Sequence, residues 1–386
     1  MKLNATYIKI RDKWWGLPLF LPSLILPIFA HINTFAHISS GEVFLFYLPL
    51  ALMISMMMFF SWAALPGIAL GIFVRKYAEL GFYETLSLTA NFIIIIILCW
   101  GGYRVFTPRR NNVSHGDSRL ISQRLFWQIV FPATLFLILF QFAAFVGLLA
   151  SRENLVGVMP FNLGTLINYQ ALLVGNLIGV PLCYFIIRVV RNPFYLRSYY
   201  SQLKQQVDAK VTKKEFAIWL LALGALLLLL CMPLNEKSTI FSTNYTLSLL
   251  LPLMMWGAMR YGYKLISLLW AVVLMISIHS YQNYIPIYPG YTTQLTITSS
   301  SYLVFSFIVN YMAVLATRQR AVVRRIQRLA YVDPVVHLPN VRALNRALRD
   351  APWSALCYLR IPGMEMLVKN YGIMLRIQYK QKLSHW

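Results

Sequence analysis

Charged residues are scarce in this sequence, and acidic residues are the scarcest. Asp, Glu, Lys and Arg make up 12% of the 386 residues, about half the share found in ordinary globular domains. This composition excludes a water-soluble globular protein and indicates an integral membrane protein. Only 12 residues are acidic against 35 that are basic, which gives a formal net charge of +23.

Cysteine is rare as well, and its distribution is uninformative. Four cysteines are scattered through the chain, three of them inside apolar runs, with no C-x-x-C pair and no metal-type spacing. We therefore predict inert packing cysteines and no metal site in this chain. A Ser-His-Asp order or a phosphate-binding loop does not stand out either, so no catalytic residue is predicted.

Long apolar runs dominate what is present. Hydrophobic residues make up 59% of the sequence, and the mean hydropathy is +0.60. A helix needs about 20 apolar residues to cross the hydrocarbon core, and lipid offers the backbone no hydrogen-bond partner, so each span is predicted to be helical. Candidate spans are about 17–37, 43–61, 63–80, 83–103, 127–150, 169–190, 216–234, 244–259, 262–280 and 299–316. Runs 63–80 and 244–259 are the weakest, so we predict about 8–10 spans.

The basic residues cluster in short segments between these runs. In a soluble protein such a charge would suggest nucleic acid, but this distribution is the positive-inside pattern of membrane proteins, and we expect no nucleic-acid partner. Even numbers of spans separate the five clusters, so all five and both termini are predicted to be cytoplasmic. The clusters are Lys2–Lys13, Arg104–Arg124, Arg188–Lys214, Arg260–Lys264 and Arg318–Arg328.

The junction after the last span has an apolar stripe. Leu315, Val322, Ile326 and Leu329 are spaced by seven, four and three residues, which allows one helix over 315–330 to pair with a copy of itself as a homodimer. The simpler interpretation is a basic stop at the membrane exit. The two interpretations are compatible.

Two short segments after this junction contain recognisable motifs: residues 329–334 (LAYVDP) with 338–340 (LPN), and residues 359–364 with 370–372. The first resembles the L-A-x-x-D-x-L-T-x-L-x-N motif, and the second keeps the spacing of the D-x-D-x-F-K-x-x-N-D-x-Y-G segment, of GGDEF domains, the bacterial diguanylate cyclase fold. The resemblance implies a small α/β fold, here incomplete because the chain ends before the Gly-Gly-Asp-Glu-Phe signature.

Departures from the family pattern argue against cyclase activity. The two metal-binding aspartates of the family correspond to Arg360 and Pro362, and neither side chain supplies the oxygen ligands that magnesium requires. The guanine-reading pair corresponds to Val368 and Lys369, and only Asn340 survives at a ligand-contacting position. We expect GTP or cyclic di-GMP to act only through degenerate or missing domains.

The membrane half contains three short features: residues 65–71 (LPGIALG), Asn91 and residues 255–262 (MWGAMRYG). With them, residues 15–316 roughly resemble the first type of MASE domain, a bacterial membrane sensor found ahead of GGDEF and EAL outputs. Gly67/Gly71 and Gly175/Gly179 also have the four-residue spacing that permits close helix approach.

Polar side chains at membrane depth are the candidate sensing residues. They serve either function or interhelical hydrogen bonding, and the second is the simpler interpretation. The residues are Asn91, Gln141, Asn168, Gln170 and Asn176. A second group near the predicted outer ends would form a pocket for a small ligand or metal, or simply be solvated; it comprises His31, His37, Glu42, Glu84, Glu153 and His279.

These observations predict an all-α polytopic membrane helix bundle followed by a small incomplete α/β segment. We assign residues 1–316 to a MASE-type sensor, 317–330 to a signalling helix and 331–386 to a degenerate GGDEF fragment in the bacterial inner membrane. The resemblance implies that a longer form hydrolyses cyclic di-GMP to pGpG with an EAL domain and magnesium or manganese; this chain itself needs no cofactor. A transporter or channel is the competing class, and the sequence does not identify the sensed signal.

The shared side of the basic clusters yields a direct test. Reporter fusions after Arg110, Lys210 and Arg325 are expected to report the cytoplasm, whereas fusions near Asn162 and Tyr288 are expected to report the outside. An outside signal at Lys210 would contradict the arrangement.

Overall fold

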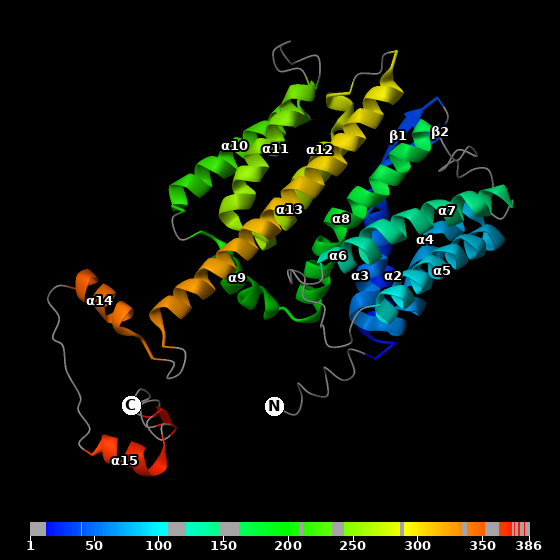
Figure 1. Cartoon of the computed structure of the whole chain (residues 1–386). Helices are drawn as coiled ribbons and strands as arrows, with labels where there is room; N and C mark the ends of the chain where they lie inside the picture. The colour runs from blue at the N-terminus through cyan, green and yellow to red at the C-terminus, as the bar shows by residue number, and fades with distance from the viewer. Residues whose placement is uncertain are drawn as a thin grey trace. The chain divides into compact units, whose positions relative to one another are not determined.

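The computed structural model of the chain (Figure 1) is divided into two units, Met1–Thr317 and Arg318–Trp386, and each is described by itself. The described residues are 13–39, 41–106, 121–146, 162–208, 211–233, 243–285, 289–333, 338–351, 363–372, 374, 377–378 and 382.

The first unit is a bundle of apolar helices, which confirms the predicted polytopic helix bundle. Its helices are α2 (Leu17–His31), α3 (Pro49–Phe60), α4 (Leu65–Leu80), α5 (Phe82–Phe106), α6 (Ile121–Arg124), α7 (Phe131–Phe145), α8 (Leu163–Arg191), α9 (Tyr195–Gln206), α10 (Lys213–Cys231), α11 (Thr243–Tyr261), α12 (Tyr263–His279) and the start of α13 (Tyr291–Tyr331). Short turns of 3-10 helix cover Ser61–Ala64 and Tyr281–Asn283, and a π-helix covers Leu125–Val130.

Within the described chain, six helical stretches are long and apolar enough to cross a membrane. They are Pro49–Leu80, Phe82–Phe106, Leu125–Ala143, Leu163–Arg191, Lys213–Cys231 and Tyr291–Tyr331. α2 and α12 are apolar but shorter, with 15 and 17 residues. The first stretch is interrupted, because Ser61 has a φ of 55° and separates α3 from α4.

Polar contacts define one end of the bundle, here called the basic end. The amide of Asp208 donates to the carbonyl of Arg260 at 3.0 Å, and the amide of Lys264 donates to Oε1 of Gln206 at 3.1 Å. The amide of Tyr263 donates to Oγ1 of Thr317 at 2.9 Å. The basic segments after α8 and α11 and the turn of α13 that contains Thr317 therefore meet at one end.

The opposite end, here called the hairpin end, carries an antiparallel hairpin of β1 (Thr34–Ile38) and β2 (Gly41–Phe46). The Tyr281 hydroxyl donates to the carbonyl of Phe35 at 3.2 Å, and Nδ2 of Asn283 donates to the carbonyl of Cys231 at 2.8 Å. The ends of α10 and α12 therefore lie at the same end as the hairpin.

The hairpin corrects two predicted spans. Runs 17–37 and 43–61 were each expected to be one helix, but α2 ends at His31 and α3 begins only at Pro49. Residues 43–46 are β-branched, aromatic or leucine, and they are buried in the protein, where strand pairing satisfies the backbone as well as a helix would. α3 is shorter than a membrane-crossing helix, and 10 of its 12 residues are buried.

The two glycine pairs bring helices of one chain into close approach. A Cβ on Gly67 would lie 2.5 Å from the carbonyl oxygen of Pro18 in α2, and one on Gly71 would lie 3.1 Å from that of Pro22. On α8, a Cβ on Gly175 would lie 2.0 Å from the Tyr47 carbonyl oxygen. These pairs thus fix α4 on α2 and α8 on the segment that enters α3.

The second unit contains the remainder of α13 with α14 (Val341–Asp350) and α15 (Met364–Tyr371). Asn340 caps α14: its Oδ1 accepts from the amides of Arg342 and Ala343 at 3.0 and 3.1 Å. An isolated bridge joins Val332 to Pro339. α15 ends at Tyr371, and Gly372, which follows it, has a φ of 82°.

Gly175→Ala is expected to lower the stability of the bundle by about 1–3 kcal/mol, because the new methyl group overlaps backbone that cannot move alone. The measurement is the unfolding midpoint of the purified protein in nanodiscs. Gly224→Ala in α10 is the matched control, since no atom of the described residues lies within 4 Å of its added Cβ. Equal midpoints for the two variants would contradict this packing.

Candidate functional site

Three of the predicted intramembrane polar residues attach α8 to three different elements. Oδ1 of Asn168 accepts from the amide of Phe44 in β2 at 2.7 Å. Nε2 of Gln170 donates to Oγ of Ser300 in α13 at 2.8 Å, and Nδ2 of Asn176 donates to the Ile129 carbonyl of the π-helix at 3.4 Å. All three side chains are buried, so α8 is the polar hub of the bundle.

The other two polar candidates lie apart from this hub. Asn91 in α5 is half-buried and has no side-chain hydrogen bond within the described part of the chain. Nε2 of Gln141 in α7 is buried and likewise has no partner among the described residues. The five residues therefore do not form one site.

The degenerate nucleotide positions belong to the second unit. Asn340 is occupied by its cap, and its Nδ2 also donates to the carbonyl of Ala330 at 2.8 Å. Val368 is half-buried and Lys369 is exposed on α15. Arg360 and Pro362 lie outside the described residues.

A cavity of about 500 Å³ opens at the hairpin end. Its walls come from α2, both strands, α3, α4, α5 and α7, with aliphatic surface from Leu26, Met53, Ile72 and Leu88. Pockets for small organic molecules have volumes of this order and are mostly apolar with a few polar groups.

A continuous series of aromatic rings forms one side of the cavity. Neighbouring ring centroids lie 4.3–5.5 Å apart, which is the range of favourable ring contacts. The rings are Phe35, Phe44, Tyr47, Phe136, Phe140 and Phe92. They come from β1, β2, α5, α7 and the segment between β2 and α3, so any displacement of the hairpin changes the shape of this wall.

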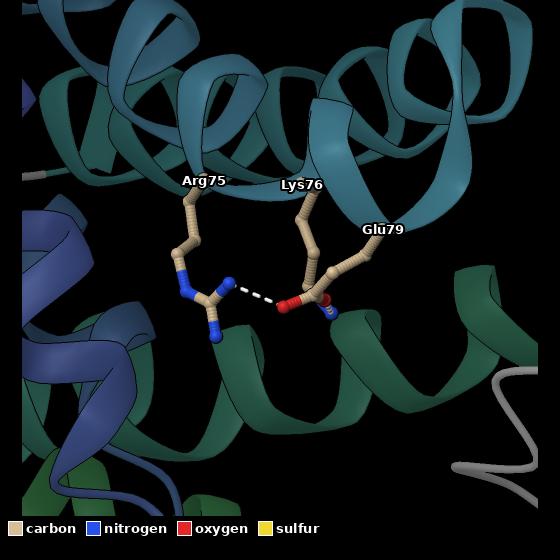
Figure 2. A network of polar contacts seen from close by, with 3 residues as sticks. All are labelled: Arg75, Lys76 and Glu79. Atoms are coloured by element: carbon tan, nitrogen blue, oxygen red, sulfur yellow. Dashed lines mark hydrogen bonds and ion pairs between the residues drawn. The ribbon is translucent and has the colours of Figure 1, made fainter.

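Charged residues of α4 supply polar groups to the cavity. Arg75 and Lys76 both line it and both pair with Glu79 (Figure 2). The Lys76 Nζ to Glu79 Oε2 distance is 3.0 Å, and the guanidinium of Arg75 donates to Oε1 of the same carboxylate. Two cations therefore share one carboxylate.

On the opposite rim, Nδ1 of His37 lies 3.4 Å from Oε1 of Glu42, and these side chains are 78% and 54% exposed. Of the second group of predicted residues, only these two line the cavity. His31, Glu84 and His279 do not, and Glu153 lies outside the described residues.

Among the described residues, the lining of the cavity includes no serine, threonine or cysteine, and no group of three or more His, Cys, Asp or Glu side chains in the described ranges could hold a metal. Sequence reasoning missed Arg75 and Lys76 as site residues. The signal that could have identified them is that two basic residues stand at a predicted outer end, whereas the five basic clusters are all predicted to be cytoplasmic.

Comparisons with known proteins agree with the membrane architecture. The MASE1 family matches residues 15–320. The chain is 99% identical over all of its 386 residues to "Cyclic di-GMP phosphodiesterase PdeF" of Escherichia coli (strain K12), of which it covers 52%. It is 25% identical over 375 residues to "Probable cyclic di-GMP phosphodiesterase PdeA" of the same organism, of which it covers 50%. The chain thus spans about half the length of these relatives, and no solved structure matches it.

Asn168→Ala is expected to destabilise the hairpin by about 1–3 kcal/mol, because it leaves the buried Phe44 amide without its acceptor. Hydrogen exchange at residues 43–46 measures the effect, and exchange should accelerate there. Asn91→Ala is the control and should leave the same amides unchanged. Equal protection in both variants would show that the Asn168 bond does not hold the hairpin.

Proposed function

The chain belongs to the MASE1 family, and we propose that it is the membrane-embedded sensor part of a longer protein that acts in cyclic di-GMP signalling. It is a multi-pass inner-membrane protein, and its nearly identical relative is named a cyclic di-GMP phosphodiesterase. Hydrolysis to pGpG, with magnesium or manganese, would belong to an EAL domain of the longer form.

The observation that carries this proposal is α13. This helix is continuous from Tyr291 to Tyr331, so it begins inside the bundle and extends past its boundary at Thr317. Inside the bundle it is held by Gln170 and by Trp270, whose Nε1 donates to Oγ of Ser306 at 3.0 Å. This continuity along the chain supports a role for α13 in transmitting a rotation or shift from the bundle to whatever follows it.

A chain of contacts leads from the cavity to α13. Phe44 lines the cavity and donates its amide to Asn168, and Gln170, two residues further along α8, donates to Ser300 of α13. This spatial continuity supports a coupling between the hairpin and the output helix, which mutation has to test.

We propose further that the basic end is cytoplasmic and the hairpin end periplasmic. The positive-inside bias supports this orientation, since Arg188, Arg260 and Lys264 end or begin helices at the basic end. The cavity would then sample molecules outside the cytoplasm.

We also propose that α13 pairs with its copy in a homodimer. Leu315, Val322, Ile326 and Leu329 are 45–62% exposed along it, and an exposed apolar stripe at heptad-like spacing is buried when two such helices associate. Residues 317–330 would act as the signalling helix, and 331–386 as a degenerate GGDEF fragment that links the sensor to the output.

Helix insertions after Arg320 test the proposal in the longer form. One added alanine rotates everything downstream by about 100° and is expected to change the rate of cyclic di-GMP hydrolysis by about 5-fold or more. Seven added residues restore the heptad register and should keep the rate close to that of the parent.

Equal rates of cyclic di-GMP hydrolysis in the two insertion variants would show that α13 does not transmit the signal. Uptake of a solute by proteoliposomes that contain the bundle would favour the transporter class instead.

A further inference from the structure

We propose that the cavity at the hairpin end binds an amphipathic organic anion, with its apolar body against the aromatic wall and its carboxylate or phosphate at Arg75 and Lys76. The signalling consequence of such binding rests on the proposed sensor function, whereas the binding itself is a property of this chain.

The apolar part of the ligand follows from the lining. Six aromatic rings in continuous contact, together with aliphatic side chains such as Met53 and Leu88, surround a space of about 500 Å³. Such a surface gains free energy by excluding water from an aryl or alkyl group. A fully hydrated inorganic ion gains nothing from it.

The charged part follows from the cations of α4. Arg75 and Lys76 both line the cavity and share the single carboxylate of Glu79, so these three side chains carry a net positive charge. The side chains of Arg75 and Lys76 are 31% and 30% exposed, and a guanidinium offers a carboxylate or phosphate the planar geometry that such groups favour.

Glu79 acts as the internal counter-ion in this arrangement. It is bonded to both Arg75 and Lys76, so an incoming anion competes with it for the same two cations. This competition predicts that removal of the cation weakens anion binding and that removal of the carboxylate strengthens it. A purely structural ion pair predicts no such opposite effects on anion binding.

A cationic ligand is the alternative that the aromatic wall raises, since rings bind ammonium groups and Glu42 lies on the rim. The carboxylate of Glu42 is already beside His37, however, and it lies at the more exposed side of the cavity. Arg75 and Lys76 are less exposed than Glu42 and outnumber the one carboxylate that they share, which favours the anion.

The test uses the purified chain in phosphatidylcholine nanodiscs and three probes with one shared body: 4-phenylbutyrate, 4-phenylbutan-1-ol and 4-phenylbutylamine. Binding is measured by calorimetry, and the signal from empty nanodiscs is subtracted. The acid is expected to bind about tenfold more tightly than the alcohol or the amine, because a hydrogen bond to a charged group contributes a free energy of about that size.

Variants then assign the preference to named groups. Arg75→Gln should abolish the preference for the acid, Arg75→Lys should retain part of it, and Glu79→Gln should tighten acid binding. Arg197→Gln, at an exposed position on α9, is the matched control and should leave all three affinities unchanged.

Replacement of one third of the lipid by phosphatidylglycerol distinguishes the sources of the anion. Displacement of 4-phenylbutyrate would assign the site to a lipid phosphate, and unchanged binding would assign it to a soluble acid; both outcomes support an anion site. The proposal is overturned if the alcohol or amine binds wild-type protein as tightly as the acid, or if Glu79→Gln weakens acid binding. Because this assay requires no hydrolysis, its failure is distinguishable from failure of the insertion experiment.

Discussion

The architecture depends on one constraint: backbone polar groups inside a bilayer have to be satisfied by the protein itself. Helices meet this constraint alone, and most of the first unit is therefore helical. The hairpin is permitted because its backbone groups find partners in the protein: its strands pair with each other, and the amides of Phe44 and Leu48 are bonded to Asn168 and Asn33. A non-helical segment at the membrane thus marks where the bundle can enclose a cavity.

Sequence patterns predicted what depends on composition and period. Apolar run length revealed the bundle, and the distribution of lysine and arginine anticipated that the basic segments after α8 and α11 meet at one end. These properties are local, so a single stretch of chain contains the whole signal.

The features that sequence did not reveal depend on distant segments. A buried strand and a buried helix are both continuous apolar runs, so the sequence of residues 43–46 does not indicate that they pair with β1. The cavity draws its walls from elements between Leu26 and Phe140, and no local period encodes that assembly. The glycine pairs suggested close packing, but their partners, α2 and the Tyr47 backbone, became visible only in the structure.

The bond between β2 and α8 also bears on how the protein is made. Phe44 and Asn168 are 124 residues apart. Because ribosomes add about 5–20 residues per second, Asn168 is synthesised roughly 6–25 s after the strand whose amide it accepts from. During that interval α3 lacks the helix against which Gly175 and Gly179 pack it, and at 12 residues it is too short to span the bilayer unaided. Residues 33–60 therefore reach their final packing late in biogenesis. They have to stay beside the insertion machinery until residues 163–191 have been synthesised.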